Sequence, residues 1–192
     1  MPLQIDLPPG FSGMPVGTGD RLNRSHAWMV AENVAAGAGT SIEEFGSYLM
    51  ALVPAMQANG IRVFGKFAVG TRKGDVATLT LGVTQWPETA PANRDAVVAA
   101  LAEQYRGRHK HAVVRPVRLP IGPAIVAISE GEFRLPEKGV RAQIKGEYQI
   151  PLPDNRSVVI LSVVAESEDA WPAVAEATAK VAWSLRSDEA AG

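Results

Sequence analysis

The sequence lacks cysteine, an excess of either charge, and long apolar runs. Without cysteine, the chain has no disulfide, no zinc–thiolate site and no thiol nucleophile. The 19 Lys and Arg residues nearly balance the 20 Asp and Glu residues, so the whole molecule presents no strong field to nucleic acid or acidic lipid. Because no stretch of about eighteen consecutive apolar residues occurs, we expect no membrane span.

The length and composition are typical of one globular domain. The chain has 192 residues, of which 46% are hydrophobic and 20% are charged. We predict a single domain over residues 1–192, with an irregular N-terminal segment over 1–22 and a flexible tail over 188–192. The N-terminus, MPLQIDLPPGF, has neither the positive region nor the apolar core of a signal peptide, so we expect a cytoplasmic location.

Residues 42–59 form the clearest predicted helix. Ser41 can cap it, and Glu44, one turn later, can complete a capping box that satisfies backbone amides on both sides. Pro54 removes a backbone hydrogen bond, so we expect a kink or break there, and Gly60 is a natural end. Apolar side chains at helical spacing predict one buried face, made of Ile42, Phe45, Leu49, Leu52, Val53 and Met56.

Further helices are predicted after Asn93 and after residue 167. Asn93 can cap the first of them, which we expect to end at Gly107. Pro172 stands in the first turn of the other, where its missing amide has no helical partner to lose. The predicted core stripes are Val97, Val98, Leu101 and Tyr105 in the first helix, and Trp171, Val174, Thr178, Val181, Ala182 and Leu185 in the second.

The remaining pattern predicts strands joined by short connections, which favour antiparallel pairing. Residues 157–165 (SVVILSVVA) are apolar on both faces, so we expect a central strand that is covered on both sides. Residues 8–22, rich in Gly and Pro, predict a loop. The fold class that follows is an α/β/α sandwich with a mainly antiparallel central sheet. The predicted strands are 27–34, 61–69, 76–85, 111–119, 124–133, 140–150 and 157–165.

The stretch RGRHKHAVVR (106–115) concentrates basic residues. Either its basic patch, Arg106, Arg108 and Lys110, contacts nucleic acid, or the patch is the solvated end of a helix that leads into a strand. Cations are favoured at a helix C-terminus, whereas nucleic-acid-binding domains are usually basic overall. Because this chain is nearly neutral, we favour the helix end and expect no nucleic-acid partner.

Candidate metal and phosphate sites are weak. His109 and His111 would share one face of a strand and could begin a metal site, but no spacing supports a third ligand from His26, Glu130 or Glu132. The glycine-containing loops GAGTS (37–41) and VGTGD (16–20) lack the dinucleotide and Walker fingerprints. We therefore expect no metal and no cofactor.

No catalytic constellation stands out. The chain has no G-x-S-x-G motif and no serine with a recognisable histidine partner. Glu130 and Glu132 could form an acid/base pair on one side of a strand, or simply a solvated strand end. We therefore predict a protein without enzymatic activity. The alternative is a small-molecule-binding or catalytic domain with a pocket between the sheet and the helix over 42–59.

The second half resembles the PsbP-like family, the α/β/α sandwich shared by the photosystem subunit PsbP and the Ran-binding protein Mog. The resemblance covers roughly residues 110–187, and the positions that carry it are Tyr148, Pro151, Pro153, Ser167, Ser184, Leu185 and Arg186. It implies a scaffold or partner-binding domain without catalysis, of a bacterial branch whose members are linked to secretion or envelope systems. AES (165–167) stands where the family has an S-T-P-like step, and the N-terminal LPPGF with Trp28 fits only loosely.

Trp183 is the candidate interface residue. On a helical wheel it falls opposite the core stripe of the last helix, so we expect it to be exposed. Tryptophan is enriched at binding hot spots, which suggests a protein partner or a homodimer. The other interpretation is that Trp183 rests over a neighbouring loop. The predicted partner-binding residues are Trp183, Arg106, Arg108 and Lys110.

Overall fold

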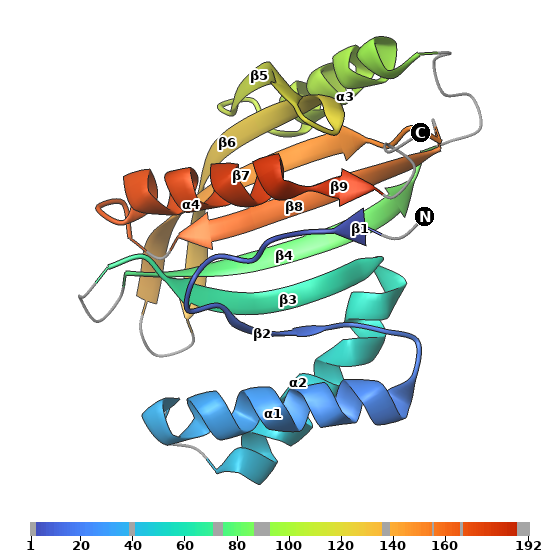
Figure 1. Ribbon diagram of the computed structural model, residues 1–192. Coiled ribbons are helices and arrows are strands. Elements are labelled where there is room, and N and C mark those ends of the chain that lie inside the picture. Colours follow the sequence, from blue (N-terminus) through green and yellow to red (C-terminus); the bar gives the residue numbers. More distant parts are fainter. Residues whose placement is uncertain are drawn as a thin grey trace.

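The computed structural model has an antiparallel sheet with helices on both of its faces, as the sequence predicts (Figure 1). It describes residues 3–38, 41–70, 75–86, 93–135, 139–154, 156–165 and 167–187. Within these residues the main sheet has seven strands in the order β2-β3-β4-β8-β7-β6-β5, and all of its neighbouring pairs are antiparallel. These strands are β2 (Ser12–Pro15), β3 (Ile61–Ala68), β4 (Val76–Gln85), β5 (Val113–Leu119), β6 (Gly122–Leu135), β7 (Gly139–Pro151) and β8 (Ser157–Ala165).

The strand β8 is the fourth of the seven, so the prediction of a central strand is confirmed. One of its faces is fully buried, from Val159 to Ala165. On the other face Val158 is buried, whereas Ile160 and Ser162 are only half-buried. The coverage of the second face is therefore partial, and the apolar run predicted more burial there than the structure shows.

The buried face of the sheet carries the helix α4 (Trp171–Ser184). Its predicted core stripe is confirmed, with Val174, Thr178 and Val181 all buried against the sheet. Gly146 on β7 makes room for the first residue of the helix, because a Cβ there would lie 2.7 Å from the ring of Trp171. The largest hydrophobic core of the described residues lies between α4 and the sheet.

The opposite face carries the other helices at its two ends (Figure 1). The helix α3 (Arg94–Arg108) packs on β5, β6 and β7, and its predicted cap Asn93 accepts a hydrogen bond from the N–H of Ala96 at 2.8 Å. The helices α1 (Asp20–Ala38) and α2 (Ile42–Ala58) pair with each other and pack on β2 and β3. Each group builds its own smaller core.

The N-terminal part differs from the sequence prediction. The strand predicted at 27–34 is wrong, because these residues belong to α1, whose buried side chains Asn23, Ala27 and Ala31 recur once per helical turn. The loop predicted at 8–22 is also wrong, since β2 lies within it. A short edge strand tolerates the proline that argued against a strand there.

The helix α2 agrees with its predicted start and end. Ser41 and Glu44 form the capping box, and the chain leaves the helix through Asn59 and Gly60, whose φ is 69°. Of the kink or break predicted at Pro54, the break does not occur, because α2 continues through this residue to Ala58. No described helix is both long and apolar enough to cross a membrane.

Candidate functional site

The N-terminal segment, residues 3–11, crosses the α4 face of the sheet beside that helix (Figure 1). Its first residues, β1 (Leu3–Gln4), pair antiparallel with β9 (Arg186–Ser187). The N–H of Asp6 donates to Ser184 Oγ at 2.9 Å, and Arg186 Nη2 reaches both carboxylate oxygens of Asp6 at 3.0 and 3.2 Å. The segment is thereby fixed to the end of α4, and it divides the surface beside that helix into two hollows.

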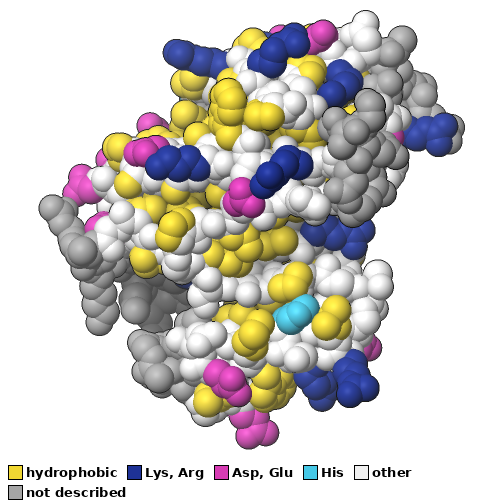
Figure 2. Space-filling model, viewed as in Figure 1, with side chains coloured by type: hydrophobic (Ala, Val, Ile, Leu, Met, Phe, Trp, Pro, Cys, Tyr) yellow, Lys and Arg dark blue, Asp and Glu magenta, His cyan; other side chains and the backbone are white. Residues whose placement is uncertain are grey.

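The first hollow, here called the α4 groove, has a volume of about 450 Å³. It lies between residues 6–9, the end of β3, and the flank of α4. Phe67 and Val181 are buried at its floor, and the exposed ion pair of Glu176 and Lys180, 2.8 Å apart, stands at its rim. Hydrophobic side chains gather on this face of the molecule, and charged side chains stand among and around them (Figure 2).

The second hollow, here called the Arg62 hollow, has a volume of about 520 Å³. Leu81, Leu152 and Leu185 are buried at its base. Its remaining apolar walls come from β3, β4 and the N-terminal segment. Three polar residues complete the lining: Arg62, Asp154 and Ser157. A mainly apolar hollow with a few polar groups is the usual form of a ligand site.

A break in the β3–β4 register places Arg62 at this hollow. Ile61 pairs with Gly82 and Val63 pairs with Leu81, so Arg62 is the extra residue of a β-bulge. Regular alternation would send the side chains of Arg62 and Val63 to opposite faces, yet both line the hollow. Bulges commonly re-aim a side chain in this way.

Gly60 allows the bulge to form. Its φ of 69° is one that side chains with a Cβ rarely adopt, and a Cβ at this position would clash with the carbonyl oxygen of Val83. Its own carbonyl accepts a hydrogen bond from the N–H of Val83 at 2.9 Å. The end of α2 and the start of β3 are therefore held against β4 at the point where the bulge begins.

Asp154 closes the turn between β7 and β8. Its Oδ1 accepts hydrogen bonds from the N–H of Arg156 at 2.9 Å and of Ser157 at 2.8 Å. Partial burial alone would raise the pKa of Asp154, but these two N–H groups and the Ser157 hydroxyl together lower it below its ordinary value of 3.8. The carboxylate is therefore charged at neutral pH, and its Oδ1 is already bound to the two N–H groups of the turn.

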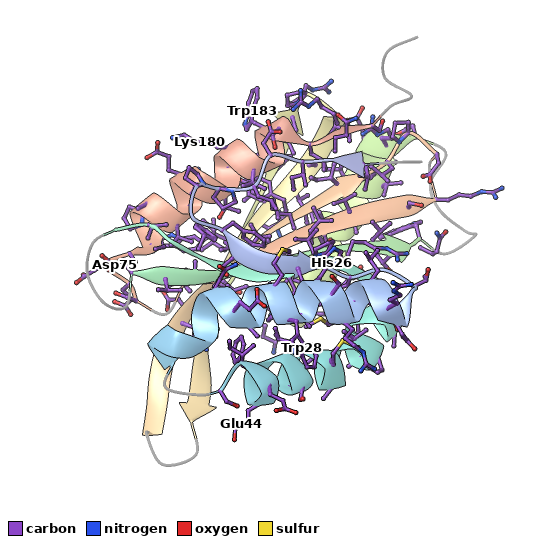
Figure 3. The ribbon with its side chains drawn as sticks, turned by 60° about the horizontal axis from the view of Figure 1, so that its bottom comes forward. His26, Trp28, Glu44, Asp75, Lys180 and Trp183 are labelled. Atoms are coloured by element: carbon purple, nitrogen blue, oxygen red, sulfur yellow. The ribbon has the colours of Figure 1, made fainter. Side chains whose placement is uncertain are left out.

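Trp183 lies where the sequence predicts. Its side chain is 58% exposed on the outer side of α4. Figure 3 shows Lys180 and Trp183 pointing away from the sheet, whereas Trp28 lies between α1 and α2. Trp171 and Trp86 are both partly buried and packed against the hydrophobic cores.

The predicted basic patch lies on the opposite face of the sheet from Trp183. Arg106 Nη1 contacts Glu103 at 2.6 Å, and its Nη2 donates to the carbonyl of Val114 at 3.2 Å, so this residue fixes the end of α3. Arg108 and Lys110 are exposed. The helix-end interpretation agrees with this placement, and the structure does not bring the patch and Trp183 together.

The histidine pair does not have the predicted strand geometry. His109 caps the end of α3, with its ring centroid 4.6 Å from that of Tyr105, and His111 precedes β5. Their placement on one face of a strand is therefore wrong. Within the residues that the structure describes, no group of three potential metal ligands from His, Asp and Glu occurs. Glu130 is exposed on β6, and the side chain of Glu132 lies outside the described part.

The α2 side of the sheet does not form either hollow. The alternative pocket predicted between the sheet and the helix over 42–59 would need lining residues from α2, and neither hollow has one. The glycine loop over 37–41 lies partly outside the described residues, and its Ser41 serves as the helix cap.

Sequence reasoning missed both Arg62 and Glu147. Glu147 on β7 is only 6% exposed, with Lys145 Nζ and Gln149 Nε2 each 2.6 Å from its carboxylate. The signal for this cluster was the alternation of Lys, Glu and Gln along one face of a strand. For Arg62, the signal was Gly60 directly before a strand.

A scan of the chain against protein-family models and a search of the curated proteins find no match.

Proposed function

We propose that this chain is a binding domain without catalysis that acts through protein contacts, with the outer side of α4 as its interface and a second copy of the chain as its partner. The observation that carries the proposal is the 58% exposure of Trp183 on a helix whose opposite side forms the main core. Large exposed aromatic side chains are typical centres of protein interfaces.

The outer side of α4 has a composition that suits close contact with another helix. Its exposed residues form a ridge, here called the α4 ridge, which consists of Pro172, Ala173, Glu176, Lys180 and Trp183. Pro172 and Ala173 at one end are small, and Trp183 at the other end is large. Trp183 lies roughly 16 Å along the helix axis from Pro172 at 1.5 Å per residue. A large residue at one end and small residues at the other make the ridge complementary in shape to itself.

The charges of the α4 ridge are self-complementary as well. In an antiparallel dimer with its two-fold axis near the middle of α4, Trp183 of each copy lies over Pro172 and Ala173 of the other. The same symmetry brings Lys180 of each copy beside Glu176 of the other. These two residues form an exposed ion pair within one helix, so exchanging partners across the interface keeps each charge paired.

The resemblance to the PsbP-like family agrees with a role without catalysis, and it extends the proposal to bacterial secretion or envelope systems. The cytoplasmic location remains an expectation from the sequence. The basic patch of Arg106, Arg108 and Lys110 is a second contact surface for a protein partner, on the opposite face. The basic patch gives weaker support to the proposal than Trp183 does, because Arg106 already has partners within α3 and β5.

The test is the mass of the protein in solution. We expect wild type to form a dimer at high concentration and Trp183→Ala to shift the equilibrium toward monomer, with its melting temperature nearly unchanged, as measured by light scattering and thermal unfolding. Tyr48→Ala is the matched control, because Tyr48 is 59% exposed on α2 and away from the ridge. This variant should keep the wild-type mass.

A charge exchange tests the geometry of the dimer. Lys180→Glu alone should weaken the dimer, since two negative charges would face each other, and adding Glu176→Lys should restore it. A wild type that stays monomeric at high concentration contradicts the proposed self-association. A large fall in melting temperature for Trp183→Ala with unchanged mass would show that Trp183 belongs to the core instead.

A further inference from the structure

We propose that the Arg62 hollow is a binding site for an aliphatic carboxylate of medium chain length. In this site the alkyl chain lies against the apolar walls and the carboxylate accepts hydrogen bonds from the Arg62 guanidinium. This small-molecule site is separate from the α4 ridge, and it does not depend on the proposed dimer.

The apolar part of the hollow suits an alkyl chain. The volume of about 520 Å³ falls within the usual range for ligand sites. Ile5, Val63 and Val83 are only half-buried, so they present apolar surface to the hollow in addition to the leucines at its base. Covering this surface with methylene groups removes it from water, and each further methylene that is buried should strengthen binding about fourfold. Affinity is therefore expected to rise with chain length until the hollow is filled.

Arg62 supplies the group that recognises the charged end. Its side chain is exposed, and among the described residues it forms no hydrogen bond or ion pair. Arg94, Arg106 and Arg186, in contrast, are all bound to protein oxygens. A guanidinium presents its N–H groups as a planar fork, and this fork matches the two oxygens of a carboxylate. A bulge that leaves an exposed arginine at the lining of an apolar hollow, without a side-chain partner among the described residues, places a cation where an anion can reach it.

The position of Asp154 sets the orientation of the ligand. Arg62 lies beside Leu81 and Gly82 on β4, whereas Asp154 precedes Ser157, which pairs with Gln85 farther along β4. The two charged residues therefore stand at different ends of the hollow. The Asp154 carboxylate would repel a second carboxylate, so the charged head is expected at the Arg62 end and the uncharged tail toward the turn.

The experiment is a titration of the purified chain with decanoate, followed by isothermal calorimetry and by NMR of the leucine and valine methyl groups. We expect saturable binding that shifts methyl signals of residues lining the hollow. Octanoate should bind more weakly than decanoate, and acetate should not bind at all. Decanol and decylamine test the charged head, and both should bind at least about tenfold more weakly than decanoate, since a charge-assisted hydrogen bond is lost.

Variants place the binding at Arg62. Arg62→Gln should weaken decanoate at least about tenfold and remove the preference for decanoate over decanol. Arg156→Gln is the matched control, because it removes the same charge near the Asp154 turn from a side chain that does not line the hollow. It should bind like wild type. Val83→Phe, which partly fills the hollow, should weaken decanoate more than octanoate.

The outcomes that overturn the proposal are distinct from one another. Absence of decanoate binding to the folded wild type overturns the site. Equal binding of decanol and decanoate by wild type overturns the carboxylate as the ligand class, and this comparison holds even where Arg62→Gln fails to fold. Methyl shifts confined to the α4 groove would place the binding elsewhere. The dimer is measured separately through Trp183→Ala, so failure of either proposal leaves the other to be judged alone.

Discussion

The two ends of the chain bury their helices with different chemistry. At the C-terminal end, α4 covers the central strand with branched apolar side chains, and Val159, Val163 and Val174 are each 0% exposed. At the N-terminal end, α1 packs through small and polar residues. Asn23, Ala27 and Ala31 are the most buried of its described side chains, also at 0%.

The polar contact of α1 replaces apolar packing with hydrogen bonds. The side chain of Asn23 accepts from the N–H of Gly17 and donates to its carbonyl, each at 2.9 Å. These bonds satisfy the N–H and the carbonyl of Gly17, in the loop that leads into the helix, and Gln57 Nε2 on α2 also donates to that carbonyl at 2.5 Å. The C-terminal end is therefore stabilised mainly by the burial of apolar side chains, whereas the N-terminal end is stabilised partly by the two hydrogen bonds of the Asn23 side chain. Different substitutions should therefore destabilise the two ends of the chain.

The largest expected effect is at the centre of the sheet. Val159→Asp puts an unpaired charge beneath α4, where no water can reach it, and should cost several kcal/mol, comparable with a whole domain stability of about 5–15 kcal/mol. We expect no soluble folded protein, as judged by the soluble fraction after expression and by circular dichroism. Val164→Asp is the control, because Val164 is half-buried on the opposite face of β8 and pairs across the strand with Lys145. It should stay folded, and equal loss of both variants would contradict the difference between the two faces.

A smaller effect is expected at the N-terminal end. Asn23→Ala leaves the N–H of Gly17 without its partner, whereas the carbonyl of Gly17 keeps the bond from Gln57 Nε2, and the variant should cost about 1–3 kcal/mol. For a chain of this size, each kcal/mol lowers the melting temperature by about 2–4 °C. Asn33→Ala is the control, because Asn33 is exposed on the same helix and its side chain donates only to the carbonyl of Met29. Its effect should stay within about 0.5 kcal/mol. Equal effects of the two variants would show that the contact with Gly17 contributes little.

The comparison also explains which parts of the fold the sequence could predict. β8 and α4 are marked by a long apolar run and a clear helical stripe, so their type and position were predictable, as was the burial of the stripe of α4 and of one face of β8. The stripe of α1 has the same spacing, but Asn23 and Ala27 do not stand out as core residues, and the apolar run AWMV within 27–34 suggested a strand. A buried asparagine is identifiable only from its partner, and Gly17 becomes its partner only in the folded chain.

The two candidate sites, Trp183 and the Arg62 hollow, also differ in how far the sequence predicts them. The exposure of Trp183 follows from the helical wheel of one element, so the sequence alone predicted it. The Arg62 hollow depends on a register shift between two strands and on a turn elsewhere in the chain. No local sequence pattern predicts the register between β3 and β4. Gly60 marks a special backbone conformation, but the pairing with β4 decides what that conformation does to Arg62.

The smallest expected effect tests the turn that leads into β8. Asp154→Asn keeps the side-chain oxygen that accepts the N–H groups of Arg156 and Ser157 but removes the negative charge. The folded-state pKa of Asp154 lies below its ordinary value of 3.8, so the charged form contributes stability above that pH, and the contribution is lost as the pH falls through the folded-state pKa. Because the residue is exposed, we expect a difference of less than about 1 kcal/mol. Urea unfolding should show wild type more stable than the variant at pH 7, with the two curves converging as the pH falls through the folded-state pKa of Asp154. A stability difference that persists unchanged at low pH would show that the substitution acts through the shape of the turn rather than through the charge. The position of Asp154 at the hollow would then depend on the geometry of the turn and not on the charge of its carboxylate.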